Sequence, residues 1–231
     1  MKLLTIGGNT KIRKSDAGGE YLTAILHLSP AKLSGKEFCA GRSKGCTDVC
    51  LNTAGRGVMR PVQKARLEKS RFFIEHRLSF LALLKFELHA FERKCAKLGV
   101  KPAVRLNGTS DLPWEKFDII QAFPNIQFYD YTAVAIRFHN SWRLPSNYHL
   151  TFSLKEDNRE KALEVLRNGG NVAVVFRNSI PKSWNGFEVI NGDSTDLRFK
   201  DSKNVVVGLT AKGKAKKDTT GFVQDIEVTN G

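Results

Sequence analysis

The sequence predicts a single α/β domain over residues 1–231, built as a partial or distorted β/α (TIM-like) barrel with a cysteine-rich loop after its first core strand. From about residue 20 onward, short runs rich in β-branched and aromatic residues alternate with helical segments and long loops. This alternation is typical of a mainly parallel sheet with covered faces. About seven such runs are present, which favours a barrel-like sheet over a sandwich. With 41% apolar residues, the 231 residues can enclose one large core.

The order of the elements follows from these local patterns. Strands are predicted over residues 21–28, 103–108, 126–131, 148–154, 171–176, 187–190 and 205–210. The strongest helical signal begins at Pro61, a residue suited to a first helical turn, and continues to Leu98. We expect a break or bend near His76 and a stop at Gly99. A second helix is predicted over residues 157–168, where two glycines end it.

The loop after the first strand, predicted over residues 29–57, contains Cys39, Cys46 and Cys50 within twelve residues. The N-terminus does not resemble a signal peptide, so a reducing compartment is expected and metal or cluster ligation explains the clustering better than a disulfide framework. Three thiolates leave one coordination position open for chemistry, whereas a closed structural site normally takes four protein ligands. These cysteines therefore predict a four-iron, four-sulfur (4Fe-4S) cluster whose free iron could bind S-adenosylmethionine.

Two other interpretations of the cysteines stay open. One is a zinc site completed by a distant histidine or cysteine, and the other is a set of plain reduced thiols. The usual zinc-ribbon pattern needs Cys-x-x-Cys pairs, which the sequence lacks. Cys95 extends the apolar stripe of the long helix and is expected in the core.

Polar residues gather where the predicted strands end. In parallel β/α architectures, functional side chains collect at these ends because the loops can vary while the sheet stays rigid. We predict substrate contacts or catalytic roles for Asp111, Tyr129, Asp130 and Asp193. Cofactor-binding roles are predicted for Asn107, Gly108 and Ser153. The competing interpretation is that such residues only form turns.

The chain is strongly basic, with a formal net charge of +14 and a pI near 9.8. Such a field attracts polyanions, so nucleic acid or a nucleotide is the expected partner. The predicted contacts are Arg56, Arg60, Lys64 and Arg71, directly after the cysteine loop, and Lys212 and Lys214 in a basic loop over residues 211–220. A solvated helix face and a solubilising tail are the alternatives. No stretch approaches the roughly 18 apolar residues of a membrane span, so we expect a cytoplasmic protein without membrane contact.

Several short motifs together resemble a known family. They are GGNTKI at 7–12, SPA at 29–31, CLNTAGRG at 50–57, RLNGTSD at 105–111, NGD at 191–193 with Asp196 and Arg198, and AKGKAKKD at 211–218. As a set, and over nearly the whole chain, they resemble the "gene product 88-like" family of bacteriophage proteins. More distantly, the chain is similar to radical S-adenosylmethionine enzymes, in which a partial β/α barrel carries a three-cysteine cluster loop just after its first strand. The spacing differs, being Cys-x6-Cys-x3-Cys here and commonly Cys-x3-Cys-x2-Cys in those enzymes.

This resemblance implies a phage iron–sulfur protein in the cytoplasm of the infected cell. It would act on nucleic acid or a nucleotide by S-adenosylmethionine-dependent chemistry. The rival hypothesis, from another class, is a non-catalytic nucleic-acid-binding protein of phage replication or host takeover, in which the cysteine loop holds a structural zinc or iron–sulfur site.

Overall fold

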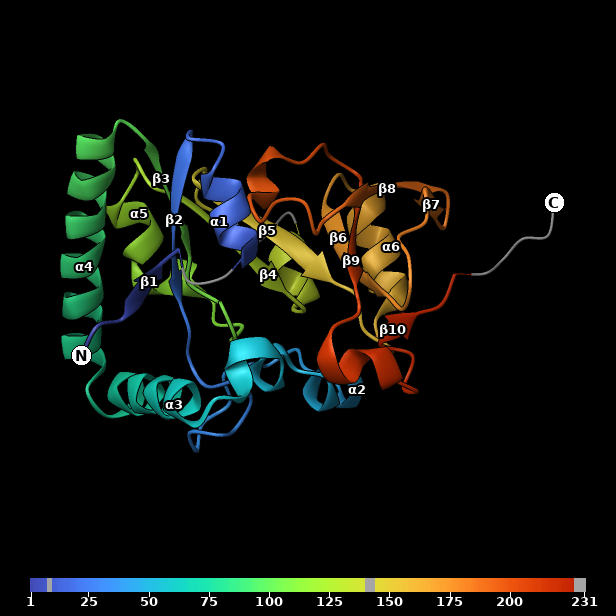
Figure 1. Cartoon of the computed structure of the whole chain (residues 1–231), viewed down its shortest axis with the longest axis horizontal. Helices are drawn as coiled ribbons and strands as arrows, with labels where there is room; N and C mark the ends of the chain where they lie inside the picture. Colours follow the sequence, from blue (N-terminus) through green and yellow to red (C-terminus); the bar gives the residue numbers. More distant parts are fainter. Residues whose placement is uncertain (8–9, 140–143, 227–231) are drawn as a thin grey trace.

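The computed structural model describes residues 1–7, 10–139 and 144–226 and shows a mixed α/β fold (Figure 1). Within these residues a ten-stranded sheet has the order β1-β2-β3-β4-β5-β6-β9-β8-β7, and β10 pairs with β6 beside this path. All neighbouring strands are parallel except β1, which is antiparallel to β2, and β7, which is antiparallel to β8. The predicted mostly parallel sheet is therefore confirmed.

The elements have the following bounds. The strands are β1 Leu4–Ile6, β2 Tyr21–Leu26, β3 Lys101–Arg105, β4 Gln127–Thr132, β5 Tyr148–Ser153, β6 Asn171–Phe176, β7 Ser183–Trp184, β8 Phe187–Asn191, β9 Val206–Thr210 and β10 Val223–Gln224. The α-helices are α1 Thr10–Asp16, α2 Lys44–Asp48, α3 Arg60–Glu75, α4 Arg77–Leu98, α5 Ile119–Ala122 and α6 Arg159–Arg167. Short 3-10 helices are η1 Leu51–Thr53, η2 Gly55–Val58, η3 Trp114–Phe117, η4 Ala135–Phe138, η5 Arg198–Lys200 and η6 Gly213–Lys217.

The sheet is open, so closure into a TIM-like barrel is not confirmed. Its path ends at β1 on one edge and at the β7–β8 hairpin on the other, and these edges do not pair. All seven predicted strands are present with small shifts at their ends. The strands that the sequence did not predict, β1, β7 and β10, have only two or three residues, which is too few to show a periodic pattern.

The long helical segment divides where it was predicted to. His76 lies between α3 and α4 with φ −135° and ψ 53°, outside the helical region, and Gly99 ends α4 in the left-handed conformation with φ 66°. One face of α4 buries Phe80, Leu84, Leu88, Phe91 and Cys95. Each such large apolar side chain stabilises the fold by about 1.5–3 kcal/mol when fully buried. Cys95 is 1% exposed and belongs to the core, as expected.

The two faces of the central strands differ in chemistry because successive side chains of a strand point to opposite sides. Leu26, Val104, Phe128 and Leu150 lie on one face and pack with α4 and α5 in the main apolar core. The opposite face is polar and carries Arg105, Tyr129, Tyr131, His149 and Thr151.

No helix in the described part of the chain combines the length and the apolar character that crossing a bilayer requires.

Candidate functional site

The cysteine loop lies across the carboxyl ends of the parallel strands. It leaves β2 and pairs first with the segment after β3, where the Asp111 amide donates to the Phe38 carbonyl at 2.7 Å and Cys39 forms a parallel bridge with Asp111. Farther along, the Gly45 amide donates to Glu156 Oε1 at 2.6 Å, just beyond β5. Figure 1 shows α2, η1, η2 and α3 continuing along this same side of the sheet.

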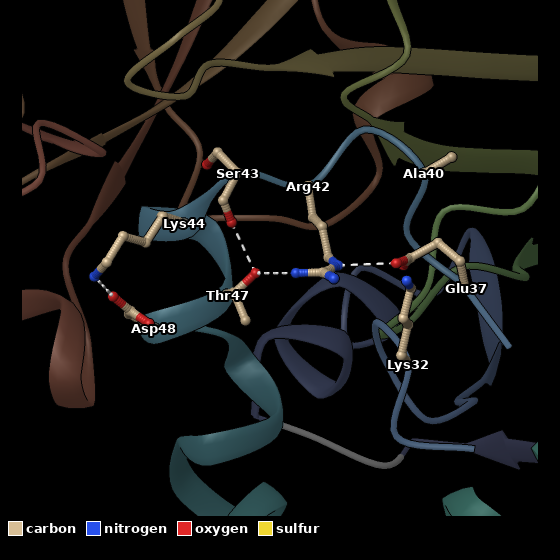
Figure 2. Close-up of a pocket in the computed structure, with 8 residues that line it drawn as sticks. All are labelled: Lys32, Glu37, Ala40, Arg42, Ser43, Lys44, Thr47 and Asp48. Carbon is tan, nitrogen blue, oxygen red and sulfur yellow. Dashed lines mark hydrogen bonds and ion pairs between the residues drawn. The ribbon is translucent and has the colours of Figure 1, made fainter. Parts of the chain in front are cut away.

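Close backbone approach fixes the course of the loop. A Cβ at Gly41 would lie 2.9 Å from the carbonyl carbon and oxygen of Ala133, directly after β4. Real side chains do not tolerate such contacts, so only glycine allows the loop to touch this segment. Arg42 links two parts of the cysteine loop. Its Nε donates to Glu37 Oε2 and its NH1 to Thr47 Oγ1, each at 3.1 Å (Figure 2).

An open hollow of about 500 Å³ lies beside Arg42 on the cysteine loop (Figure 2). The residues around it include the Arg42–Glu37 and Lys44–Asp48 ion pairs but none of the three loop cysteines. The Cys39 thiol instead contacts the segment after β3, 3.9 Å from the Thr109 carbonyl oxygen. The Cys39 thiol therefore faces the segment after β3 and not this hollow.

The three loop cysteines are free and half-buried. Burial raises the pKa of Cys39 to about 12 and that of Cys46 to about 11, and it also raises the pKa of Cys50. Negative charge on Cys46 or Cys50 would raise the pKa of Cys39 further, so the thiols are near enough to interact electrostatically. At neutral pH they carry their protons.

The thiols share one end of the sheet without forming a ready-made ligand set. Among the residues that the structure describes, no group of three or more His, Cys, Asp or Glu side chains is arranged to hold a metal ion. Two cations that were not predicted to act on the cysteines favour thiolate formation: Arg66 lowers the pKa of Cys50, and Lys155 lowers that of Cys46, each against the larger effect of burial. Lys155 lies two residues after the end of β5, so its position near a strand end was the signal that could have identified it.

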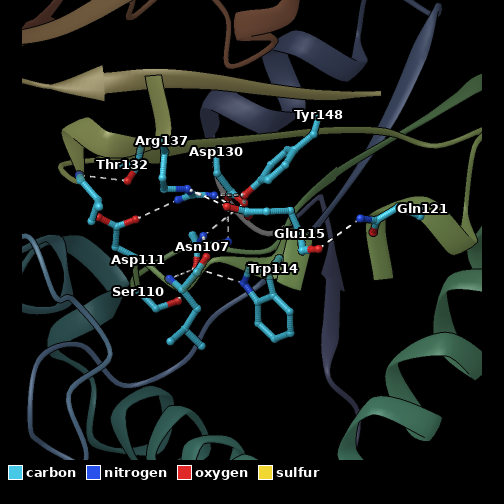
Figure 3. A network of polar contacts seen from close by, with 12 residues as sticks. Asn107, Ser110, Asp111, Trp114, Glu115, Gln121, Asp130, Thr132, Arg137 and Tyr148 are labelled. Atoms are coloured by element: carbon cyan, nitrogen blue, oxygen red, sulfur yellow. Dashed lines mark hydrogen bonds and ion pairs between the residues drawn. The ribbon is translucent and has the colours of Figure 1, made fainter. Parts of the chain in front are cut away.

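Asn107 organises the segment after β3 (Figure 3). Its Oδ1 accepts hydrogen bonds from Ser110 Oγ at 2.9 Å, from the Leu112 amide at 2.9 Å and from Trp114 Nε1 at 3.1 Å. At Gly108, an added Cβ would lie 2.7 Å from both His27 Cδ2 and Ile25 Cγ2. Both residues therefore position this segment against the sheet.

Asp130 and Asp111 belong to one buried polar network (Figure 3). Asp130 accepts hydrogen bonds from the Asn107 amide at 2.7 Å and from the Tyr148 hydroxyl at 2.9 Å. Burial raises the pKa of Asp130 to about 7. Arg137 binds Glu115 with two hydrogen bonds of 2.8 and 3.0 Å and reaches Asp111 Oδ1 at 3.3 Å. These carboxylates tie together the segments after β3 and β4.

The other predicted site residues lie elsewhere. Tyr129 is on the opposite face of β4 from Asp130, and its hydroxyl donates to Asp196 at 3.0 Å. Asp193 accepts from Lys212 Nζ at 2.7 Å and from the Thr210 amide at 2.9 Å, so it holds the end of β9. Ser153 is half-buried at the carboxyl end of β5. The structure thus brings Asp111 next to the cysteine loop and distributes Tyr129, Asp130 and Asp193 over three different surroundings.

The sequence model of a protein family described as Gene product 88 matches residues 1–226. The chain belongs to the Gene product 88 family. The match includes every residue singled out above, from Asn107 to Lys214 and all three loop cysteines. Comparisons with curated proteins and with solved structures found no match.

In this member of the Gene product 88 family, the predicted nucleic-acid contacts are all exposed. Arg56 lies on η2, and Arg60, Lys64 and Arg71 lie on α3. Lys212 and Lys214 belong to the C-terminal basic segment, which the structure folds into η6. Two further α3 cations turn inward instead: Arg66 NH1 donates to Asn52 Oδ1 at 2.6 Å, and Lys69 Nζ to the Leu3 carbonyl at 2.7 Å.

The fold brings the two basic segments together although about 150 residues separate them. A Cβ at Gly213 would lie 3.3 Å from Ala54 Cβ, so η6 rests against the residues that precede η2. Val49 of the cysteine loop packs with Ala215 of η6 in a small apolar cluster. A hollow of about 530 Å³ between α2 and η6 has Lys44, Lys214 and Lys217 in its lining. The two basic segments therefore meet beside the cysteine loop, and Asp48 and Asp218 also line the hollow between α2 and η6.

Proposed function

We propose that this protein is an iron–sulfur enzyme that acts on nucleic acid or a nucleotide, with Cys39, Cys46 and Cys50 as ligands of a 4Fe-4S cluster. The observation that carries the proposal is the position of three free thiols on one loop across the carboxyl ends of parallel strands. That edge is where β/α enzymes place their chemistry. The more distant resemblance to radical S-adenosylmethionine enzymes supports it, since there too a three-cysteine loop follows the first parallel strand.

The donor set fits such a centre in its chemistry. Thiolates suit iron–sulfur clusters and soft or borderline metals, and three of them leave one position free. When bound, a four-iron cluster supplies a binding position for S-adenosylmethionine and an electron for its cleavage. Arg66 and Lys155 offset negative charge that gathers at Cys50 and Cys46. Because the thiols do not form a ligand set in the structure, the loop must draw the sulfurs together as their protons leave.

Among the predicted catalytic residues, Asp111 is the candidate for direct participation. It pairs with Cys39 in the β-bridge, and its charge raises the pKa of the Cys39 thiol. Arg137 and the Ala133 amide hold the Asp111 carboxylate in place. We assign Asn107, Gly108 and Asp130 to positioning this segment, and Asp193 to positioning Lys212 of the C-terminal basic segment.

Metal analysis of the anaerobically purified protein tests the proposal. We expect about four irons and four sulfides per chain in the wild type and a loss of both in Cys46→Ala. Cys95→Ala is the matched control, because it also removes one thiol but from the core beneath α4, and it should keep the cluster. Full metal content in Cys46→Ala would contradict the proposal.

The second candidate is a non-catalytic nucleic-acid-binding protein with a structural zinc or cluster. The contact between the two basic segments favours it, because binding a phosphate backbone requires no reaction. One zinc per chain, with little iron or sulfide, would support this candidate against the enzyme.

A further inference from the structure

Buried polar atoms without hydrogen-bond partners gather on the polar face of the sheet. In the described residues nine buried side-chain nitrogen or oxygen atoms have no partner, and seven of them lie in this one region. The seven are Arg105 Nε, Tyr131 OH, His149 Nε2, Thr151 Oγ1, Arg198 Nε, Arg198 NH1 and Asp201 Oδ2. Folded proteins rarely leave buried polar groups unsatisfied, so a concentration of this kind requires an explanation.

The topology places these side chains next to one another. Tyr131 on β4 and Thr151 on β5 are register partners, so their side chains point to the same face. The Arg105 guanidinium lies 4.7 Å from the centre of the Tyr131 ring. Arg198 on η5 faces β5, where its charge adds to the effect of burial in lowering the pKa of His149 to about 4. Arg198 and Thr151 are each 0% exposed.

Six of the seven unpartnered atoms can donate a hydrogen bond. The nitrogens of both guanidinium groups are donors only, the two hydroxyls rotate freely, and a neutral His149 can carry its proton on Nε2. The seventh atom, Asp201 Oδ2, is an acceptor and lies 3.3 Å from Arg198 NH1 without the geometry of a hydrogen bond. A ligand that satisfies this set must therefore be rich in acceptors.

The local charges also favour an anion. Asp196 is approached by two cations, Lys11 Nζ at 3.1 Å and Arg105 NH1 at 3.6 Å, and its Oδ2 accepts from the Tyr129 hydroxyl. One carboxylate therefore serves two positive side chains. The Nε edge of Arg105 is left for another acceptor.

We propose that the polar face between β3, β4, β5 and η5 binds an oxyanion, the phosphate or carboxylate group of a small ligand. Arg105 and Arg198 provide the charge, and the hydroxyls of Tyr131 and Thr151 complete the donor set. This site is separate from the cysteine loop in its residues, and its test requires no metal.

Thermal unfolding of the full chain in inorganic phosphate, in acetate and in chloride at equal ionic strength tests the proposal. At an anion concentration of about 100 Kd, we expect Tm to rise by on the order of 5 °C above the chloride value. A rise with phosphate alone identifies a phosphoryl ligand, and a rise with acetate alone identifies a carboxylate. The absence of a rise with both anions would overturn the proposal.

Two fully buried threonines, Thr151 on β5 and Thr23 on β2, make a matched pair. Thr151→Val removes a hydroxyl that has no partner, so Tm without the anion should be equal or higher, while the anion should bind about tenfold more weakly. Thr23→Val removes a hydroxyl that donates to Asp16 Oδ1 at 2.8 Å, so it should lower Tm and keep the response to the anion. Unchanged anion affinity in Thr151→Val would refute the site, whether or not charge variants of Arg105 fold.

Discussion

At the scale of single residues, the two faces of the central strands differ in how their buried polar groups are hydrogen-bonded. Asp130 and Asn107 belong to a network in which each side chain has partners, and such networks give a structure one well-defined arrangement. Across the sheet, Arg105, Thr151 and Arg198 keep donor or hydroxyl groups that meet no acceptor. The first arrangement positions the segments after β3 and β4, and the second is open to a ligand.

Replacing Asp130 by Asn should change how stability depends on pH. Burial raises the pKa of Asp130 from 3.8 to about 7, so between these values the native state holds a proton that the unfolded state has lost. Wild-type stability should therefore fall as pH rises from about 4 to 7, by an amount on the order of 4 kcal/mol for this group alone. In Asp130→Asn this fall should be missing, as measured by urea unfolding at several pH values.

The test is the difference in unfolding free energy between the wild type and Asp130→Asn, because both proteins share every other titrating group. The stability difference should shift in favour of Asp130→Asn up to about pH 7 and stay level above pH 8. Glu160→Gln, an exposed change on α6, is the surface control for the same measurement. A difference that does not vary with pH would show that Asp130 is ionised throughout.

At the scale of elements, the cysteine loop is fixed by contacts with three successive strand ends. It bridges to Asp111 after β3, touches Ala133 after β4 and binds Glu156 after β5. Ser43 adds a second bond to Glu156, from its hydroxyl to Oε2 at 2.7 Å. The positions of the sulfurs therefore depend on the sheet as well as on the spacing of the cysteines.

Gly41→Ala should displace this loop. Its Cβ would meet the backbone of Ala133 at 2.9 Å, and neither backbone segment can yield as a flexible side chain would. We expect a loss of about 1–3 kcal/mol in unfolding free energy and a reduced metal content after anaerobic purification.

The control is Gly18→Ala, whose Cβ would lie in ordinary contact, 3.5 Å from the Ser15 carbonyl oxygen. It should change stability by less than about 0.5 kcal/mol and leave metal content unaltered. Equal stability and equal metal content in the two variants would mean that the contact with β4 does not position the cysteines.

At the scale of the whole molecule, the net charge of +14 is distributed so that two basic segments meet beside the cysteine loop. The contact between Gly213 and Ala54 joins η6 to the residues before η2. Lys64 has an acidic neighbour, Glu68, at 3.8 Å, but this exposed pair is weak and leaves the charge available. A polyanion could therefore extend along α3 and η6 past the candidate metal centre.

Nucleic-acid affinity should fall steeply with salt. The double change Arg60→Gln and Lys64→Gln should reduce the slope of log affinity against log salt by about two if each side chain neutralises one phosphate. Arg167→Gln with Lys203→Gln removes the same amount of charge near the amino end of β9, where α6 also ends, on the side of the sheet away from the cysteine loop. This double change should alter the slope little. Equal slopes in both double variants would assign the binding to general charge rather than to this surface.

Many of the helices and strands could be predicted from the sequence because local residue patterns determine them. The helix break at His76 and the stop at Gly99 depend on residues within one turn, and the strand over residues 171–176 has the predicted bounds. The short strands β1 and β7 were missed because they exist only through their antiparallel partners. Whether the sheet closes was likewise beyond local patterns, since closure depends on how the twist accumulates over all its strands.

The features of the candidate site also separate into those set by local sequence and those set by tertiary structure. The sequence by itself determined that three cysteines share one loop after a core strand and that cations follow them, because these are facts of spacing along the chain. Only the tertiary structure decided that Asp111 joins that loop, that Tyr129 and Asp130 serve opposite faces, and that Arg198 comes to lie over β5. These relations join residues up to 72 positions apart, as in the Cys39–Asp111 bridge. Pairing between strands and the burial of one face, rather than any local preference, bring such residues together.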